Sequence, residues 1–227
     1  MEISGFEKMT LTDYPGYVAA IVFTQGCNFK CPFCHNSDLI YFKKGLIDEN
    51  EILNYLSKRK NVLDGVVITG GEPTMQNDLV SFLNKVKELG LKVKLDTNGV
   101  KPEVLKKIIE LNLVDYIAMD IKSSNNNYSV VSGVSVDLDK ISESVKLIKE
   151  SELDFEFRTT VVKNYHTLND LLSICEFVGK DSKYFLQNFE SSSRVLDANL
   201  KGFTKDELLE MCAKLNEKFP NVKVRGI

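Results

Sequence analysis

Short apolar runs alternate six times with stretches whose apolar residues recur at helical spacing. Short apolar runs are typical of buried strands, whereas helical spacing is typical of helices that pack by one face. The predicted strands cover about residues 17–24, 66–68, 91–95, 114–121, 154–162 and 183–187, with a last one at 222–224. This alternation implies parallel strands joined by right-handed crossovers. The expected fold is an α/β, incomplete (β/α)6, TIM-like barrel.

The predicted helices carry start and stop signals at their ends. Asp48-x-x-Glu51 and Thr204-x-x-Glu207 have the form of capping boxes, and Pro102 is suited to the first turn of a helix. Gly90 follows the apolar stripe of residues 79–89 and predicts a left-handed C-terminal cap. Further helices are expected over about 138–148 and from 167 onward.

We expect one domain over residues 1–227. A chain of 227 residues with 43% hydrophobic content can bury one sizeable core, and no linker or repeat divides it. Residues 1–16 are interpreted as a polar lead-in that ends in the turn-like Asp13-Tyr14-Pro15-Gly16. Residues 200–227 are expected to form a C-terminal helix and strand.

Composition argues against several classes of partner. The 29 basic and 32 acidic residues are mixed along the chain, so no basic surface for nucleic acid is predicted. The apolar runs are too short to span a membrane, and the first residues lack a signal-peptide pattern. Five cysteines, an odd number, favour a reducing compartment over a disulfide framework. We therefore expect a cytoplasmic protein.

Three of the five cysteines lie within one short segment, residues 25–36, called the cysteine loop below. Cys27, Cys31 and Cys34 have the spacing C-x3-C-x2-C and directly follow the first predicted strand. Thiolates favour iron–sulfur clusters or zinc, and a structural zinc site normally needs four protein ligands. Only three are local, and His35 is too close in sequence to Cys34 to reach the same metal easily. The pattern favours a cluster with one open iron; the alternatives are a zinc site or unconnected thiols.

Unusual polar segments also follow the next three predicted strands: Gly70-Gly71-Glu72-Pro73, Asp96-Thr97-Asn98 and Asp120-Ile121-Lys122. In such a barrel these segments meet at the C-terminal face, where catalytic groups lie. Glycines without a Cβ allow a ligand to approach closely, or form an ordinary turn. Asp120 and Lys122 share one face of a strand, and facing inward they would require a ligand or partner. Arg158 shares a face with Glu156, so a structural ion pair and a ligand contact are both open.

The cysteine loop resembles the signature of radical S-adenosylmethionine (SAM) enzymes, C-x3-C-x-aromatic-C, with Phe33 in the aromatic position. The resemblance implies that the three cysteines hold a [4Fe-4S] cluster, whose open iron binds the amino and carboxylate groups of SAM. It further implies reductive cleavage of SAM to methionine and a 5′-deoxyadenosyl radical, and an iron–sulfur oxidoreductase of the radical SAM barrel type.

Within that superfamily, the chain is similar to the enzymes that activate glycyl radical enzymes. Cys31-Pro32-Phe33-Cys34-His35-Asn36, Leu95-Asp96-Thr97-Asn98-Gly99 and Asp120-Ile121-Lys122 resemble segments of pyruvate formate-lyase activating enzyme. Nearly the whole chain is similar to the longer form of the anaerobic ribonucleoside-triphosphate reductase activating proteins. That similarity includes Thr12-Asp13-Tyr14-Pro15-Gly16, Val22 to Cys27, and Val224-Arg225-Gly226. It implies abstraction of a hydrogen atom from a glycine of that reductase, with electrons from flavodoxin or ferredoxin.

The resemblance also implies roles for single residues. Phe33 and His35 would lie near the adenine, Gly71 beside Glu72 would bind the amino group, and Asp120 and Lys122 would bind ribose and carboxylate. Asp96 and Thr97 resemble positions that hold a monovalent cation beside SAM, and Arg158 is a candidate contact to the SAM carboxylate. One departure is that Gln187 stands near the position of a late, ribose-contacting histidine in the formate-lyase activator.

Two other hypotheses compete with the reductase activator. The same chemistry could act on another glycyl radical enzyme, of the pyruvate formate-lyase type, or on a small molecule. A protein of another class, a non-catalytic metal-binding or electron-transfer module, would bind zinc or a cluster without cleaving SAM. Cys175 and Cys212 lie on apolar helical stripes and are interpreted as core residues.

Overall fold

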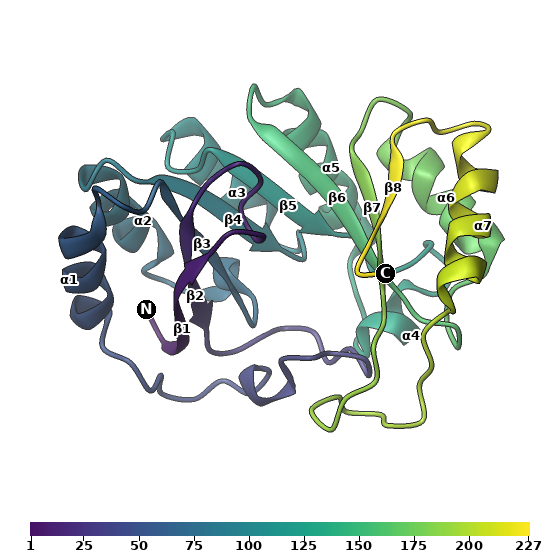
Figure 1. Ribbon diagram of the computed structural model, residues 1–227, viewed down its shortest axis with the longest axis horizontal. Helices are drawn as coiled ribbons and strands as arrows, with labels where there is room; N and C mark the ends of the chain where they lie inside the picture. The colour runs from purple at the N-terminus through teal and green to yellow at the C-terminus, as the bar shows by residue number, and fades with distance from the viewer.

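The computed structural model describes residues 1–227 and contains one eight-stranded sheet in the order β1 to β8 (Figure 1). The strands are β1 Ile3–Thr10, β2 Ala19–Thr24, β3 Gly65–Gly70, β4 Lys92–Thr97, β5 Tyr116–Asp120, β6 Asp154–Val161, β7 Tyr184–Asn188 and β8 Val222–Arg225. From β2 to β8 all neighbours are parallel, and β1 and β8 are not paired with each other. The predicted incomplete α/β barrel is confirmed.

Seven α-helices connect these strands. They are α1 Glu49–Arg59, α2 Leu79–Glu88, α3 Pro102–Glu110, α4 Tyr128–Ser132, α5 Leu138–Glu150, α6 Leu168–Val178 and α7 Lys205–Asn216. All predicted helices are present, and α7 and β8 are the expected C-terminal helix and strand. The short α4 was not predicted. No helix has both the length and the apolar character needed to cross a lipid bilayer.

The helix ends largely follow the predicted signals. Thr204 forms a capping box with Glu207, and Gly90 follows α2 with a φ of 81°. Asp48 caps α1 by accepting a hydrogen bond from the Asn50 N–H. Thr167 forms a second capping box, with Asp170, at the start of α6. Side-chain oxygens thus satisfy N–H groups that a helix leaves free at its N-terminus.

The prediction of a polar lead-in over residues 1–16 is wrong for residues 3–10. These residues form β1, which pairs antiparallel with β2. Only Ile3 and Thr10 of β1 are buried, and the residues between them are partly or fully exposed. An edge strand with solvent on one side lacks the continuous apolar run by which buried strands are recognised.

The main core lies between the sheet and the helices. Ribbons of α1, α2, α3, α5, α6 and α7 follow the outer side of the curved sheet (Figure 1). Alternate residues of β5, such as Ile117 and Met119, pack into this outer core, whereas Tyr116 and Ala118 belong to a small second cluster. Asp120 continues the second face. The inner face therefore presents polar and charged side chains where a ligand could bind.

Candidate active site

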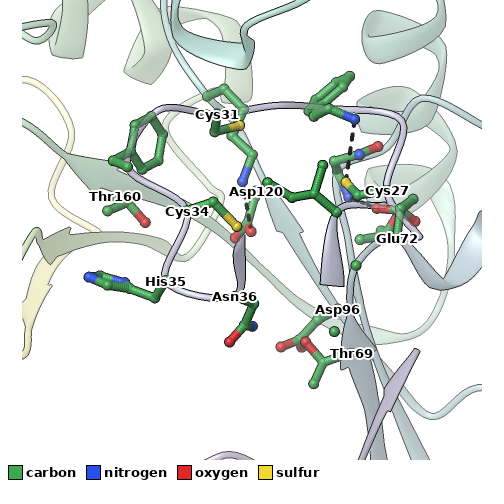
Figure 2. Close-up of a pocket in the computed structure, with 18 of the residues that line it drawn as sticks. Cys27, Cys31, Cys34, His35, Asn36, Thr69, Glu72, Asp96, Asp120 and Thr160 are labelled. Carbon is green, nitrogen blue, oxygen red and sulfur yellow. Dashed lines mark hydrogen bonds and ion pairs between the residues drawn. The ribbon is translucent and has the colours of Figure 1, made fainter. Parts of the chain in front are cut away.

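The cysteine loop is held in place by backbone hydrogen bonds. Gly26 and Cys27 donate to the carbonyls of Leu39 (2.8 Å) and Ile40 (2.9 Å), and Lys30 donates to the carbonyl of Ser132 at the end of α4 (2.8 Å). Figure 2 shows the sulfur atoms of Cys27, Cys31 and Cys34 on the inner side of the loop. All three cysteines line a cavity of about 230 Å³ at the C-terminal ends of the strands. The predicted convergence of loop and strand ends is observed.

The three thiols are soft ligands on one loop that line one cavity, a donor set suited to an iron–sulfur cluster. No group of three or more His, Cys, Asp or Glu side chains is arranged to hold one metal ion. In a cluster each thiolate binds a different iron, so the sulfurs need not converge on one point. Burial raises the pKa of Cys27 to about 12 and that of Cys31 to about 11. The thiols must therefore release protons when they bind metal.

A row of five charged side chains crosses the inner face of the sheet beside the cysteines. Arg158 on β6 donates from Nε to Asp120 on β5 (2.8 Å) and from Nη1 to Asp96 on β4 (3.2 Å). Lys122 Nζ lies 3.1 Å from Asp120, and Lys94 Nζ lies 2.5 Å from Asp96. Although burial opposes ionisation, Arg158 and Lys122 lower the pKa of Asp120 to about 2. Arg158 thus forms a structural ion pair, one of its two open interpretations, but with Asp120 and Asp96. Glu156, which shares its face of β6, pairs with Arg225 instead.

Both carboxylate oxygens of Glu72 already accept hydrogen bonds from the protein. Its Oε1 accepts hydrogen bonds from the N–H and hydroxyl of Thr74 and from the Thr97 hydroxyl. Its Oε2 accepts from the Asn98 N–H at 2.7 Å. The side chain is buried, and burial raises its pKa. The four hydrogen-bond donors favour the ionised carboxylate and oppose that rise. Glu72 therefore joins the ends of β3 and β4 beneath the cavity.

Gly71 is required by a close approach of two backbones. An added Cβ would lie 2.2 Å from the carbonyl oxygen of Gly26, inside the cysteine loop. Its N–H donates to the carbonyl of Thr24 (2.9 Å), whereas its own carbonyl has no hydrogen-bond partner in the protein and Gly71 lines the cavity. A free carbonyl beside the cysteines suits an amino group.

Gly71→Ala is expected to reduce cluster incorporation, because the new methyl group forces the strand end and the cysteine loop apart. Overpacking of this kind costs about 1–3 kcal/mol. Iron and sulfide per chain after reconstitution measure the effect. Gly90→Ala is the control: its Cβ meets nothing within 4 Å, and its φ of 81° adds a backbone strain that Gly71→Ala lacks. Equal iron content in the two variants would contradict the prediction.

Phe33 and His35 both line the cavity and contact different neighbours. Phe33 is buried and its ring centroid lies 6.4 Å from that of Tyr165. The exposed His35 stacks on Phe189 after β7, at 5.4 Å between centroids, and its Nε2 lies 2.7 Å from the Glu190 carbonyl. The cysteine loop is thereby connected to the segment that follows β7.

Several contributors were not predicted from the sequence. Asn98 donates from its amide to Asn28 of the cysteine loop (2.9 Å), and Thr160, two residues beyond Arg158, also lines the cavity. His166 had no predicted role, yet its Nδ1 accepts from the Val162 N–H and its Nε2 donates to the Lys122 carbonyl at 2.9 Å. Burial lowers the pKa of His166, so a neutral ring orients the backbone at Lys122. Asn98 lay in a polar segment singled out from the sequence, and Thr160 has period-two spacing from Arg158, whereas His166 had no sequence signal.

Comparisons with known proteins agree with this arrangement. Residues 21–178 match the model of the "Radical SAM superfamily". A Methanocaldococcus jannaschii protein, described as belonging to the glycyl-radical enzyme activating enzymes, is 34% identical over 99% of this chain and 96% of its own length. The pyruvate formate-lyase-activating enzyme of Clostridium pasteurianum is 33% identical over 58% of this chain and 57% of its own.

Solved structures share the fold at low sequence identity. SuiB of Streptococcus suis bound to S-adenosylmethionine has a TM-score of 0.72 at 17% identity, over 89% of this chain, which spans about half (48%) of SuiB. A radical SAM methyltransferase from Sphaerobacter thermophilus has a TM-score of 0.75 at 13% identity, over 96% of this chain and 68% of its own. Radical SAM enzymes use a [4Fe-4S] cluster and SAM. The chain therefore belongs to the radical SAM superfamily and, within it, to the glycyl-radical enzyme activating enzymes.

Proposed function

We propose that Cys27, Cys31 and Cys34 hold the [4Fe-4S] cluster and that the cavity beside them binds SAM. The observation on which this rests is that one cavity combines the three thiols, the free carbonyl of Gly71 and four members of the charged row, Asp96, Arg158, Asp120 and Lys122. The Gly71 carbonyl accepts the amino group of SAM, while Lys122 and Arg158 face its carboxylate. Asp120 accepts hydrogen bonds from the ribose.

The remaining residues position the cofactors and limit access of water. Phe33 and His35 frame the adenine, and Gln187 lies on the ribose side in place of a histidine. Glu72 acts indirectly, by fixing the ends of β3 and β4. When bound, the cluster supplies the electron that cleaves SAM to methionine and a 5′-deoxyadenosyl radical. We assign that electron to an external flavodoxin or ferredoxin.

The substrate we propose is a glycine Cα–H of a protein, the anaerobic ribonucleoside-triphosphate reductase. A second hollow of about 480 Å³ adjoins the cavity and shares His35, Thr160 and Gln187 with it. No hydrophobic residue lines this hollow, and Glu190 and Arg194 after β7 form part of its wall. A polar approach to the reacting centre suits an extended peptide, whose backbone needs hydrogen-bond partners. The reductase is favoured by the similarity at residues 12–16 and 22–27.

Mixing the reconstituted protein with SAM, a reductant and the anaerobic reductase, without oxygen, is expected to produce a glycyl radical. The measurement is the electron paramagnetic resonance doublet, with the reductase glycine replaced by alanine as the control. A doublet only with a pyruvate formate-lyase would assign the chain to the second candidate, which the C. pasteurianum relative favours. SAM cleavage without either doublet would indicate a small-molecule substrate. Bound zinc, or a cluster that never cleaves SAM, would overturn the enzymatic proposal.

We also propose a cytoplasmic location, because all five cysteines are free and the three in the loop must stay reduced to bind iron.

A further inference from the structure

Lys94 is a buried ammonium to which the reaction gives no role. It lies on β4 and is only 2% exposed, and its Nζ lies 2.5 Å from Asp96 Oδ1. The ring of Tyr116 lies behind it, with the centroid 6.0 Å from Nζ. A lysine is rarely buried unless it is paired, because removing the charge from water is costly. Asp96 thus pairs with the Lys94 side chain on one side, and the aromatic face of Tyr116 lies on the other.

Protein cations occupy all four carboxylate oxygens of Asp96 and Asp120. Lys94 and Arg158 take the two oxygens of Asp96, while Arg158 and Lys122 take the two oxygens of Asp120. Three positive and two negative groups leave a surplus of one positive charge. That surplus matches one carboxylate of a ligand, whereas a metal cation at either oxygen of Asp96 would lie beside a protein cation that is already there.

The second residue expected at a cation site is also engaged. The hydroxyl of Thr97 donates to Glu72 Oε1 at 2.7 Å and accepts from the Gly99 N–H at 3.1 Å. Thr97 lies on the opposite face of β4 from Lys94 and Asp96, since neighbouring residues of a strand alternate. Its hydroxyl is therefore directed towards Glu72, away from the face of β4 that carries Asp96.

We infer that the Lys94 ammonium is a built-in monovalent cation, so that this chain binds SAM without Na⁺ or K⁺. An ammonium bears the same unit charge and neutralises Asp96 through a charge-assisted hydrogen bond. Lys94 is thus a positioning residue: it holds Asp96, which holds the guanidinium of Arg158 beside the proposed SAM carboxylate. The inference rests on the proposed SAM site where it concerns SAM affinity. The expected change in melting temperature does not depend on that site.

The test compares the reconstituted protein with its Lys94→Met variant in NaCl, KCl and tetramethylammonium chloride at equal ionic strength. Methionine keeps an unbranched apolar chain and removes only the charge. Two quantities are measured in each salt: the melting temperature without SAM, and the dissociation constant of SAM by calorimetry. Lys92→Met is the matched control, since Lys92 lies two residues earlier on the same strand and is exposed.

We expect the wild-type protein and Lys92→Met to show the same melting temperature and SAM affinity in all three salts. In Lys94→Met, SAM affinity should fall about tenfold in tetramethylammonium, the effect of one charge-assisted hydrogen bond. Na⁺ or K⁺ should restore most of that loss and raise the melting temperature, whereas tetramethylammonium is too large to enter.

A specific requirement of the wild-type protein for Na⁺ or K⁺ would overturn the inference, as would a Lys94→Met variant that no small cation improves. If Lys94→Met does not fold, the wild-type measurements in the three salts still test the inference, because a specific requirement for Na⁺ or K⁺ would overturn it. If neither protein binds SAM, the proposed function fails, while the melting temperatures still test the role of Lys94.

Discussion

Replacing Cys31 by alanine is expected to abolish SAM cleavage and to leave the fold intact. Cys31 is one of only three thiols around the cavity, and no other cysteine lies near enough to replace it. Loss of one ligand should lower 5′-deoxyadenosine formation by at least about 10³-fold. Removing only a hydrogen-bond partner of a metal ligand costs about 10- to 100-fold, and removing the ligand itself should cost more. Chromatography of the nucleoside products, with iron analysis, measures the effect.

Cys175→Ala is the matched control for Cys31→Ala. Cys175 is also buried, but it packs on α6 in the outer core and does not line the cavity. Its loss should cost about 1 kcal/mol of stability and no iron, as expected for removing a small buried group. Cys31→Ala with full turnover, or iron lost only in Cys175→Ala, would refute the assignment of the cluster ligands.

Removing the guanidinium of Arg158 is expected to destabilise the protein by about 3 kcal/mol, because breaking a buried ion pair leaves uncompensated charge. Arg158→Met keeps most of the side-chain volume but removes one partner from each of Asp96 and Asp120. Lys94 and Lys122 still neutralise part of the charge on the two aspartates. The loss of stability should therefore be near the lower limit of the range for broken buried ion pairs. Urea unfolding at neutral pH measures it, and Arg59→Met, at an exposed position in α1, is the control.

The pH dependence of this loss provides a second readout. The folded protein lowers the pKa of Asp120 to about 2, below the unfolded value of about 3.9. Stability from Asp120 is therefore present above the unfolded pKa and is lost as pH falls through the folded pKa. The difference between Arg158→Met and wild type should thus shrink as pH falls from about 4 towards 2. A difference that is constant with pH would mean that Arg158 contributes by packing alone.

The order of the elements was readable from the sequence. Runs such as residues 66–68 are buried on both faces in β3, so their apolar character is continuous, and α2 shows one clear apolar stripe. β1 was missed because an edge strand exposes polar residues, and α4 because five residues are too few for a periodic pattern. The C-terminal ends of parallel strands meet at one edge, so Cys27, Gly71, Asp96 and Asp120 could be expected to lie together.

What each polar group does was decided only by tertiary structure. Glu72 was expected to contact the cofactor, yet hydrogen bonds from Thr74, Thr97 and Asn98 use its oxygens. Arg158 and Asp96 are 62 positions apart in the chain and meet because β4, β5 and β6 are adjacent in the sheet. Residue types and spacing thus determined the fold class and the choice of the three cysteines as proposed ligands, since both depend on local pattern. Hydrogen bonds and ion pairs depend on distances of a few ångströms between atoms, and only the packing of the folded sheet sets those distances.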